Sequence, residues 1–201
     1  MFVIGLTGSI AMGKTTTARL FAEEGVPVHD ADAAVHRLYE GEAAGLIEAA
    51  FPGSTRRGKV DRAALGKQVV GDPPALRRLE EIVHPLVRNA EKKFLKDAEA
   101  AGATIAVLDI PLLFETGGES RVDATVVVSA PHEMQRARVL ERGVSLEQLE
   151  ALLTRQMPDA EKRAKAHFVI ETDKGLGHAF RQVEQVVAAL RAKRLRDQNS
   201  A

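Results

Sequence analysis

Residues 8–15 read Gly-Ser-Ile-Ala-Met-Gly-Lys-Thr, and the apolar run Phe-Val-Ile-Gly-Leu-Thr at residues 2–7 leads directly into them. The spacing G-x-x-x-x-G-K-[ST] is that of a phosphate-binding loop. Such a loop joins a strand to a helix, and here an apolar run precedes it and a helical pattern follows it. The alternative interpretation is a plain glycine turn between a strand and a helix.

The residue types of this stretch suit the binding of phosphate. Gly8 and Gly13 permit backbone angles that a Cβ forbids, so the loop can point several N–H groups at one anion. The N-terminus of the following helix adds a partial positive charge. Lys14 is expected to face solvent when the loop is empty and to reach the outer phosphates when it is filled, while the Thr15 hydroxyl binds Mg²⁺. The stretch therefore predicts a nucleotide site.

Composition limits the class of protein. The chain has 201 residues, of which 45% are hydrophobic, as in a soluble globular domain. Its 28 Lys and Arg balance 28 Asp and Glu, so net charge favours neither nucleic acid nor a membrane as partner. Cysteine is absent, which excludes disulfides and cysteine-bound zinc. With no long apolar run and no visible signal peptide, we expect a cytoplasmic protein.

Apolar runs alternate with helical stretches along the chain, which indicates a parallel α/β sheet. The predicted strands are residues 2–7, 26–29, 104–109, 124–129 and 168–171. Apolar residues at three- and four-residue spacing between 176 and 190 predict a C-terminal helix that packs on the core. The basic tail after Leu190 is expected to fray.

The connection between the second and third predicted strands is long. It contains 74 residues, whereas a simple crossover needs about a dozen, so we expect extra helices there. Between residues 54 and 93, ten Lys and Arg face five Asp and Glu. This excess of positive charge fits an anionic second substrate, and it equally fits a solvated helix surface.

Three acidic residues follow predicted strands. Asp109 ends a buried apolar run, at the edge where P-loop enzymes hold Mg²⁺ directly or through water. Asp30 and Asp32 follow the second strand, and residues two apart in an extended segment point the same way. Either can take a proton from an acceptor hydroxyl, and either can cap the next helix.

The segment from Gln135 to Gln156 is rich in arginine and mostly helical in pattern. Arginines on a mobile lid can close over a triphosphate and stabilise the charge that is transferred. Acidic residues nearly balance these arginines, so a salt-bridged surface is the alternative.

Several short motifs together resemble the dephospho-CoA kinase family. The family's opening G-L-T-G-G-I-G-S-G-K-S-T corresponds to residues 5–16, and its D-A-D to residues 30–32. Its H-P-x-V-R, D-x-P-L-L-F-E and Q-x-x-R-x-x-x-R correspond to residues 84–88, 109–115 and 135–142. The likeness runs from residue 2 to about residue 171, and P-L-L-F-E together with H-P-x-V-R is its distinctive part.

The resemblance implies transfer of the ATP γ-phosphate, with Mg²⁺, to the ribose 3′-hydroxyl of dephospho-CoA, which yields CoA and ADP in the last step of coenzyme A biosynthesis. It implies a three-layer α/β/α P-loop NTPase fold with a five-stranded parallel sheet. Residues 1–201 would form one kinase domain, as a monomer or weak homo-oligomer. Its core would comprise residues 1–30, 104–130 and 167–196, its acceptor-binding insertion residues 31–103 and its lid residues 131–166.

The resemblance also assigns roles to single residues. Asp32 would be the catalytic base, with Lys14 and Arg138 beside the transferred phosphate, and Thr15 would hold Mg²⁺, with Asp109 acting through water. The nucleotide would contact Gly8, Ala11, Met12, Gly13, Lys14, Thr15, Thr16, Arg138 and Arg142. The acceptor would contact Thr7, Asp32, His84, Arg88, Asp109, Leu112, Leu113, Phe114 and Glu115. Without the resemblance, His84 is better interpreted as a helix-start residue before Pro85.

The sequence departs from the family pattern in two places. Ser9 and Met12 replace small residues of the loop, so Met12 is expected to add bulk near the nucleotide. His167 and Thr172 differ from the family's usual A-D-x-V-I-x-N pattern, close to where adenine is expected, which leaves the preference for ATP over GTP open.

Two other functions compete with this interpretation. Another small-metabolite kinase, of the nucleoside monophosphate or shikimate type, would share the loop and the lid. A nucleotide-dependent switch is a different class, but the sequence lacks the N-K-x-D motif that reads guanine. The L-S-G-G-Q motif of transporter ATPases is also absent.

Overall fold

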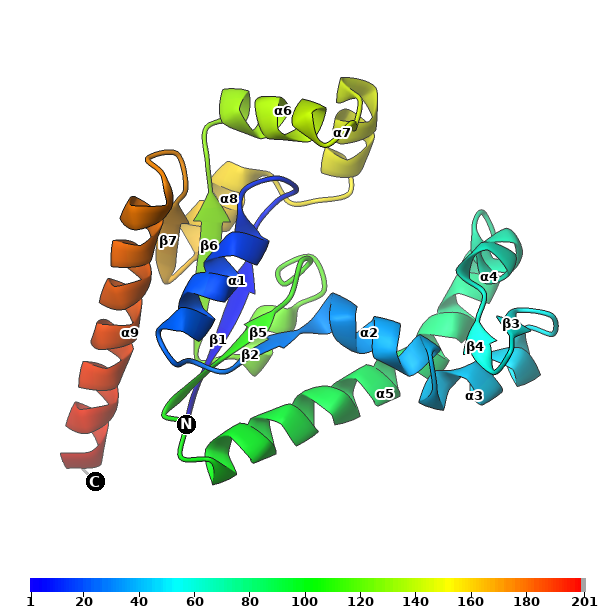
Figure 1. Ribbon diagram of the computed structural model, residues 1–201, viewed down its shortest axis with the longest axis horizontal. Helices are drawn as coiled ribbons and strands as arrows, with labels where there is room; N and C mark the ends of the chain where they lie inside the picture. Colours follow the sequence, from blue (N-terminus) through cyan, green and yellow to red (C-terminus); the bar gives the residue numbers. More distant parts are fainter. Residues whose placement is uncertain (200–201) are drawn as a thin grey trace. The chain divides into compact units, whose positions relative to one another are not determined.

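The computed structural model describes the backbone of residues 1–199 and the side chains of residues 1–196. The chain divides into two compact units. The core unit comprises Met1–His29 and Ala98–Ala201, and the insert unit comprises Asp30–Asp97. Figure 1 labels the elements of both units.

A five-stranded sheet organises the fold, in the order β2-β5-β1-β6-β7. Its strands are β1 (Phe2–Thr7), β2 (Val28–Asp30), β5 (Ile105–Asp109), β6 (Ala124–Ser129) and β7 (Phe168–Glu171). The pairs β1–β5, β1–β6 and β6–β7 are parallel, as their continuous apolar runs predict. The predicted α/β fold is confirmed. Strand β2 starts two residues later than expected, because the Val26 N–H closes the preceding turn on the Phe21 carbonyl at 3.0 Å.

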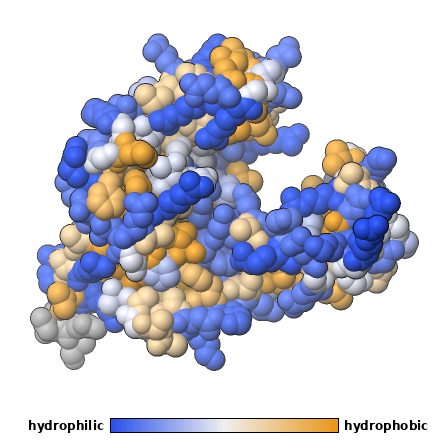
Figure 2. Space-filling view, in the orientation of Figure 1, coloured by the Kyte–Doolittle hydropathy of each residue, from blue (hydrophilic) through white to orange (hydrophobic). Residues whose placement is uncertain are grey.

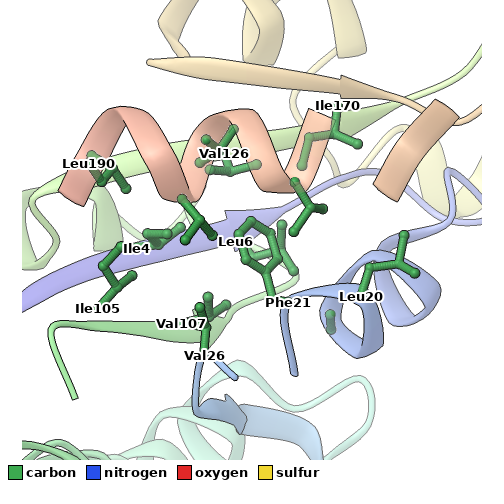
Figure 3. Close-up of a cluster of buried hydrophobic side chains, with 14 of the residues drawn as sticks. Ile4, Leu6, Leu20, Phe21, Val26, Ile105, Val107, Val126, Ile170 and Leu190 are labelled. Carbon is green, nitrogen blue, oxygen red and sulfur yellow. The ribbon is translucent and has the colours of Figure 1, made fainter. Parts of the chain in front are cut away.

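Helices α1 (Lys14–Glu23) and α9 (Leu176–Asn199) cover one face of this sheet. In Figure 3, Phe21 of α1 lies against Leu6, and Leu190 of α9 lies near Ile4. These side chains are almost completely buried. Alternate residues of the central strands therefore point toward these two helices. The predicted packing of the C-terminal helix on the core is confirmed.

The expected fraying after Leu190 is wrong, because α9 continues to Asn199. Two contacts hold this end of the helix on the core unit. Lys193 Nζ lies 5.6 Å from the centroid of the Phe2 ring, and Arg194 Nη1 donates to the Thr104 carbonyl at 3.4 Å. A cation over an aromatic face is attracted by the ring quadrupole.

Further helices of the core unit lie between its strands along the chain. They are η1 (Gly118–Arg121), α6 (His132–Glu141), α7 (Leu146–Leu153) and α8 (Asp159–Lys165). Helix α8 packs on β6, and the Ser129 hydroxyl donates to the Asp159 carboxylate at 2.7 Å.

The insert unit is helical and has its own apolar core, which includes Leu38, Ile47 and Leu65. Its elements are α2 (Ala31–Tyr39), α3 (Glu42–Ala50), β3 (Thr55–Arg56), β4 (Lys59–Val60), α4 (Arg62–Val69) and α5 (Pro73–Ala100), the last of which runs on into the core unit. Pro85 lies inside α5, so the interpretation of His84 as a helix-start residue is wrong. The hairpin β3–β4 was not predicted from the sequence.

Figure 2 shows that hydrophilic residues cover most of the visible surface of each unit. No helix within residues 1–199 is long and apolar enough to cross a membrane.

A buried ion pair joins two segments of the core unit. Loop 110–117 follows β5, and its fully buried Leu113 packs against Gly5 of β1. In the same loop, Glu115 Oε1 lies 2.9 Å from Nζ of Lys162 in α8 and accepts the Met157 N–H at 2.8 Å. The Lys162 side chain is completely buried. The pair therefore ties loop 110–117 to α8 and to the segment that precedes it.

Burial raises the pKa of the Glu115 carboxyl, but hydrogen bonds from Lys162 and from the Met157 N–H outweigh it and hold that pKa below its ordinary value of 4.5. A carboxyl whose pKa is lower in the folded state adds stability above its unfolded pKa. That contribution is lost as the pH falls through the folded pKa.

We predict that Lys162→Met lowers the free energy of unfolding at pH 7 by about 3–5 kcal/mol, because it leaves a buried carboxylate without its cation. The difference in the free energy of unfolding between the variant and the parent chain should become smaller as acid protonates Glu115. Urea unfolding at pH 7 and at lower pH measures both effects.

The control is Lys165→Met, which changes an exposed lysine three residues along in the same helix. The double variant Lys162→Met/Glu115→Gln should regain most of the lost stability, because no unpaired charge remains. Equal losses in Lys162→Met and Lys165→Met would contradict the structural role of the pair.

Candidate functional site

The loop between β1 and α1 has the backbone that a phosphate-binding loop requires. Gly13 caps α1 with φ 100°, a left-handed conformation that favours glycine. Gly8 is needed for a different reason than predicted, since a Cβ there would lie 2.6 Å from the Val128 carbonyl oxygen. Ala11 has φ 60°, which costs a non-glycine residue about 1 kcal/mol. The conformation of this loop must therefore be held by its surroundings.

Three consecutive carbonyls of the loop each accept a hydrogen bond from a side chain. Gln135 Nε2 donates to the Ile10 carbonyl at 2.8 Å, and Arg138 Nη1 donates to the Ala11 carbonyl at 3.3 Å. The Thr172 hydroxyl donates to the Met12 carbonyl at 2.7 Å. We call these three side chains the carbonyl clamp. They come from α6 and from the residue after β7.

Arg138 also fixes the clamp itself. Its Nη1 donates to the Thr172 hydroxyl at 2.9 Å, and its Nη2 donates to the Thr172 carbonyl at 2.7 Å. The Thr172 N–H in turn donates to the Ser129 carbonyl at the end of β6. The arginine that was predicted on a lid thus makes three hydrogen bonds around the loop, and its predicted contact with the triphosphate stays a prediction.

The structure shows where the Met12 side chain lies, while its expected bulk near the nucleotide stays a prediction. Its side chain is buried, and its Sδ accepts the Ala130 N–H at 3.2 Å. Met12 lines a cavity of about 300 Å³ together with Ser9 and Leu153. It does not line the cavity beside Gly13, so the longer side chain fills space behind the loop.

Lys14 does not face solvent, contrary to the expectation for an empty loop. Its Nζ donates to Oδ1 of Asp109, and both side chains are largely buried. The register that places Leu6 of β1 beside Asp109 of β5 brings the two residues to the same edge of the sheet. The pair therefore holds the ammonium group at the carboxyl ends of the strands, where ligands of open α/β sheets bind.

A cavity of about 310 Å³ lies beside the loop within the core unit. This is at the lower end of the size range of small-molecule sites. Arg138 and Arg142, four residues apart, line it together with the carboxylate of Glu141. The remaining lining residues are Gly13, Thr16, Thr17, Thr172, Gly175, Leu176 and Ala179.

The two departures near β7 have different outcomes. Thr172 follows the carboxyl end of β7 and lines this cavity. His167 precedes the other end of the strand, where its Nδ1 lies 2.9 Å from the Thr125 hydroxyl and 3.2 Å from the Thr125 N atom. The predicted influence on the choice of purine therefore remains open for Thr172 only.

The residues predicted for Mg²⁺ offer oxygen ligands of the kind that this ion prefers. Thr15 is exposed in the first turn of α1, and the Asp109 carboxylate lies beside Lys14. This donor set fits Mg²⁺, which usually binds through one or two carboxylates and substrate phosphates. Among the described side chains, those of residues 1–196, no group of three or more His, Cys, Asp or Glu is placed to hold a metal ion.

The insert unit contains a cavity of its own, of about 510 Å³. Asp32 in the first turn of α2 lines it, together with Tyr39 and Arg62. The Arg62 guanidinium lies 5.5 Å from the centroid of the Tyr39 ring. Apolar side chains complete the wall, namely Val35, Leu65, Val69 and Leu79.

The structure assigns one of the two predicted roles, that of helix cap, to Asp30, and the base role predicted for Asp32 stays a prediction. Asp30 is the N-cap of α2, and its side chain accepts the Ala33 N–H at 2.9 Å. Asp32 is exposed and belongs to the helix. The assumption of one extended segment is therefore wrong, because the helix begins at Ala31 and turns the two carboxylates apart.

The other residues predicted for the acceptor lie in both units. In the insert unit, His84 and Arg88 are exposed and four residues apart on α5, so they share one face. In the core unit, the Thr7 hydroxyl donates to the Pro111 carbonyl at 3.0 Å, and Leu112 is 39% exposed. Leu113 and Phe114 are buried, and Glu115 pairs with Lys162. The predicted contacts of all these residues with an acceptor stay predictions.

The sequence assigned no role to several residues that hold the phosphate loop, line a cavity or form a buried ion pair. Gln135 was noted only as part of a motif, although its three-residue spacing from Arg138 puts both on one face of α6. Thr172 was noted only as a departure from the family. Arg62 was noted only for its charge and as part of an Asp61-Arg62 match to the family, and Lys162 gave no signal beyond its charge, since cavity lining and burial are tertiary properties.

Comparison with known proteins gives one consistent result. The family model described as dephospho-CoA kinase matches residues 2–178. The dephospho-CoA kinase of Bradyrhizobium diazoefficiens is 61% identical over 94% of this chain and 95% of its own. That of Rhodopseudomonas palustris strain BisB18 is 59% identical over 94% and 96%.

Solved structures agree with the sequence comparison. A Thermus thermophilus protein has TM-score 0.83 and 39% identity over 94% of this chain and 96% of its own. The dephospho-CoA kinase from Campylobacter jejuni has TM-score 0.66 and 25% identity, with the same coverage. Shikimate kinase from Acinetobacter baumannii, at TM-score 0.55 and 17% identity over 97% and 96%, shares the fold alone. The phosphate loop, its lysine–aspartate pair and these matches place the chain in the dephospho-CoA kinase family.

Proposed function

We propose that this enzyme transfers the γ-phosphate of ATP to the ribose 3′-hydroxyl of dephospho-CoA, with CoA and ADP as products. The observation that carries the proposal is the Lys14–Asp109 pair at the phosphate loop, beside a cavity that contains two arginines. Family membership supports the identity of the acceptor.

The core unit supplies the nucleotide site. The N–H groups of the loop and of the first turn of α1 bind phosphate, because the first N–H groups of a helix have no partner within it. Lys14 neutralises charge on the outer phosphates, and Arg138 and Arg142 lie on the helical face toward the cavity. Thr15 would hold Mg²⁺, with Asp109 acting through water, and the ion would neutralise charge on the phosphate oxygens.

The insert unit supplies the acceptor site. Its cavity combines one cation, one carboxylate and an apolar wall, which suits a ligand with an anionic group and a long, partly apolar arm. Arg62 binds an acceptor phosphate, and Asp32 accepts the proton of the attacking hydroxyl. This assignment favours an anionic second substrate over a merely solvated surface as the reason for the basic insert.

An acceptor panel tests the proposal. ADP formation from ATP should depend on dephospho-CoA, and shikimate or nucleoside monophosphates should not replace it. The product should carry the new phosphate on the ribose 3′ oxygen. Turnover with shikimate or a nucleoside monophosphate, and none with dephospho-CoA, would contradict the proposal, because this chain would then phosphorylate a different small metabolite.

We predict that Asp32→Asn cuts phosphoryl transfer by about 10²- to 10⁴-fold, because asparagine keeps the shape of the side chain but cannot take the proton. ATP binding and the melting temperature should change little. Single-turnover kinetics and calorimetry measure the two quantities.

Asp30→Asn is the matched control, since asparagine also caps a helix N-terminus. It should retain most of the activity. An inactive Asp30→Asn beside an active Asp32→Asn would mean that the base had been assigned to the wrong residue.

We predict that Lys14→Ala lowers turnover by at least about 100-fold, the scale of a lost electrostatic stabiliser. It should also lower the melting temperature, because it removes the cation that lies against the largely buried Asp109 carboxylate. Steady-state kinetics and thermal unfolding test both parts.

The double variant Lys14→Ala/Asp109→Asn separates the two effects. It should regain the melting temperature and remain inactive, whereas the exposed Lys165→Ala should alter neither property. Recovery of activity together with stability would reduce Lys14 to a structural role.

A further inference from the structure

The carbonyl clamp has a consequence for the opposite side of the phosphate loop. In a planar trans peptide, the C=O of one residue and the N–H of the next point in opposite directions. The three clamped carbonyls belong to Ile10, Ala11 and Met12. Fixing them on the outer side therefore turns the N–H groups of residues 11, 12 and 13 away from the clamp.

One of these three N–H groups is used within the loop. The Met12 N–H donates to the Ser9 carbonyl at 3.2 Å, which closes a turn. The N–H groups of Ala11 and Gly13 flank it on the side opposite to the clamp. Successive N–H groups on one concave side form a site for an anion.

The loop does not hold this conformation by itself. Ala11 is in the left-handed region, which the alanine Cβ disfavours, and Gly13 has φ 100°. The donors that oppose relaxation lie in rigid places. Gln135 is 2% exposed, and the Thr172 N–H is fixed to the end of β6 by the Ser129 carbonyl.

From this geometry we infer that Gln135 and Thr172 are positioning residues for the nucleotide. They hold the carbonyls of residues 10 and 12 outward, and thereby hold the phosphate-binding N–H groups inward. Their side chains act through the loop and not on the reacting atoms. This inference rests on the proposed function in so far as the anion is the phosphate chain of ATP.

Helix α6 takes a different role under this inference. Gln135 and Arg138 lie one turn apart on it and bind adjacent carbonyls of the loop. The start of the predicted lid is thus a support of the loop, and any movement that opens α6 would also release the Ile10 and Ala11 carbonyls. Binding of the phosphate chain and the position of α6 are thereby coupled.

Thr172→Val tests the inference, because valine keeps the shape of threonine and removes the hydroxyl. The Kd for ATP should rise about tenfold, the scale of a buried carbonyl left without its donor. The KM for ATP should rise with it, while the KM for dephospho-CoA should stay the same. Calorimetry with ATP alone gives the Kd independently of phosphoryl transfer.

Two matched variants control this measurement. Thr172→Ser keeps the hydroxyl and should bind ATP within about twofold of the parent chain. Thr154→Val removes the hydroxyl of an exposed residue, which donates to the Ala151 carbonyl at 2.9 Å and not to a loop carbonyl, and should change neither constant. An equal loss in Thr172→Ser and Thr172→Val would overturn the assignment, since the hydroxyl would then not be the cause.

Gln135→Met tests the neighbouring bond without touching Thr172, and it keeps the assignment testable if Thr172→Val fails to fold. It should weaken ATP binding in the same direction. A folded Gln135→Met or Thr172→Val with the Kd of the parent chain overturns the inference.

The strain at Ala11 provides a further check. In an Ala11→Gly background the left-handed conformation carries no Cβ penalty, so Thr172→Val should weaken ATP binding by less than in the parent chain. An equal or greater loss would contradict the role of the clamp in holding Ala11. Failure of the proposed function looks different, because the parent chain would then bind ATP and show no transfer to dephospho-CoA.

Discussion

The planar peptide bond is the constraint on which the nucleotide site depends. A loop that points N–H groups at an anion must point carbonyls in the other direction, and those carbonyls then need donors of their own. Here the donors are Gln135, Arg138 and Thr172. The site is therefore built from both sides of the loop, and helix α6 and the end of β7 are parts of it.

The same reasoning explains the charges at the sheet edge. Parallel pairing of β1 with β5 brings Lys14 and Asp109 together, and Asp109 is largely buried. A second buried pair, Glu115 with Lys162, ties the following loop to α8. In each pair, the opposite charge stabilises a buried ionised group. Removal of one member therefore destabilises the folded protein more than removal of both.

Local patterns in the sequence predicted much of this architecture. The strand, glycine loop, lysine and helix of residues 2–23 are consecutive, and the other core strands are continuous apolar runs, so their identities follow from the chain itself. The choice between Asp30 and Asp32 as helix cap needed the first turn of α2. The direction of Met12, the burial of Lys162 and the clamp from Thr172 depend on contacts between residues far apart in the chain, which no local pattern contains.

The backbone amides of the loop can be observed individually by NMR on isotope-labelled protein titrated with Mg²⁺ and ATP. If the N–H groups of Ala11 and Gly13 bind the phosphate chain, their resonances should move strongly to higher proton frequency, as expected for hydrogen bonds to an anion. The amides of Arg191 and Lys193, near the far end of α9, should stay unchanged. ATP binding that leaves the Ala11 and Gly13 resonances in place would contradict an inward-facing, clamped loop.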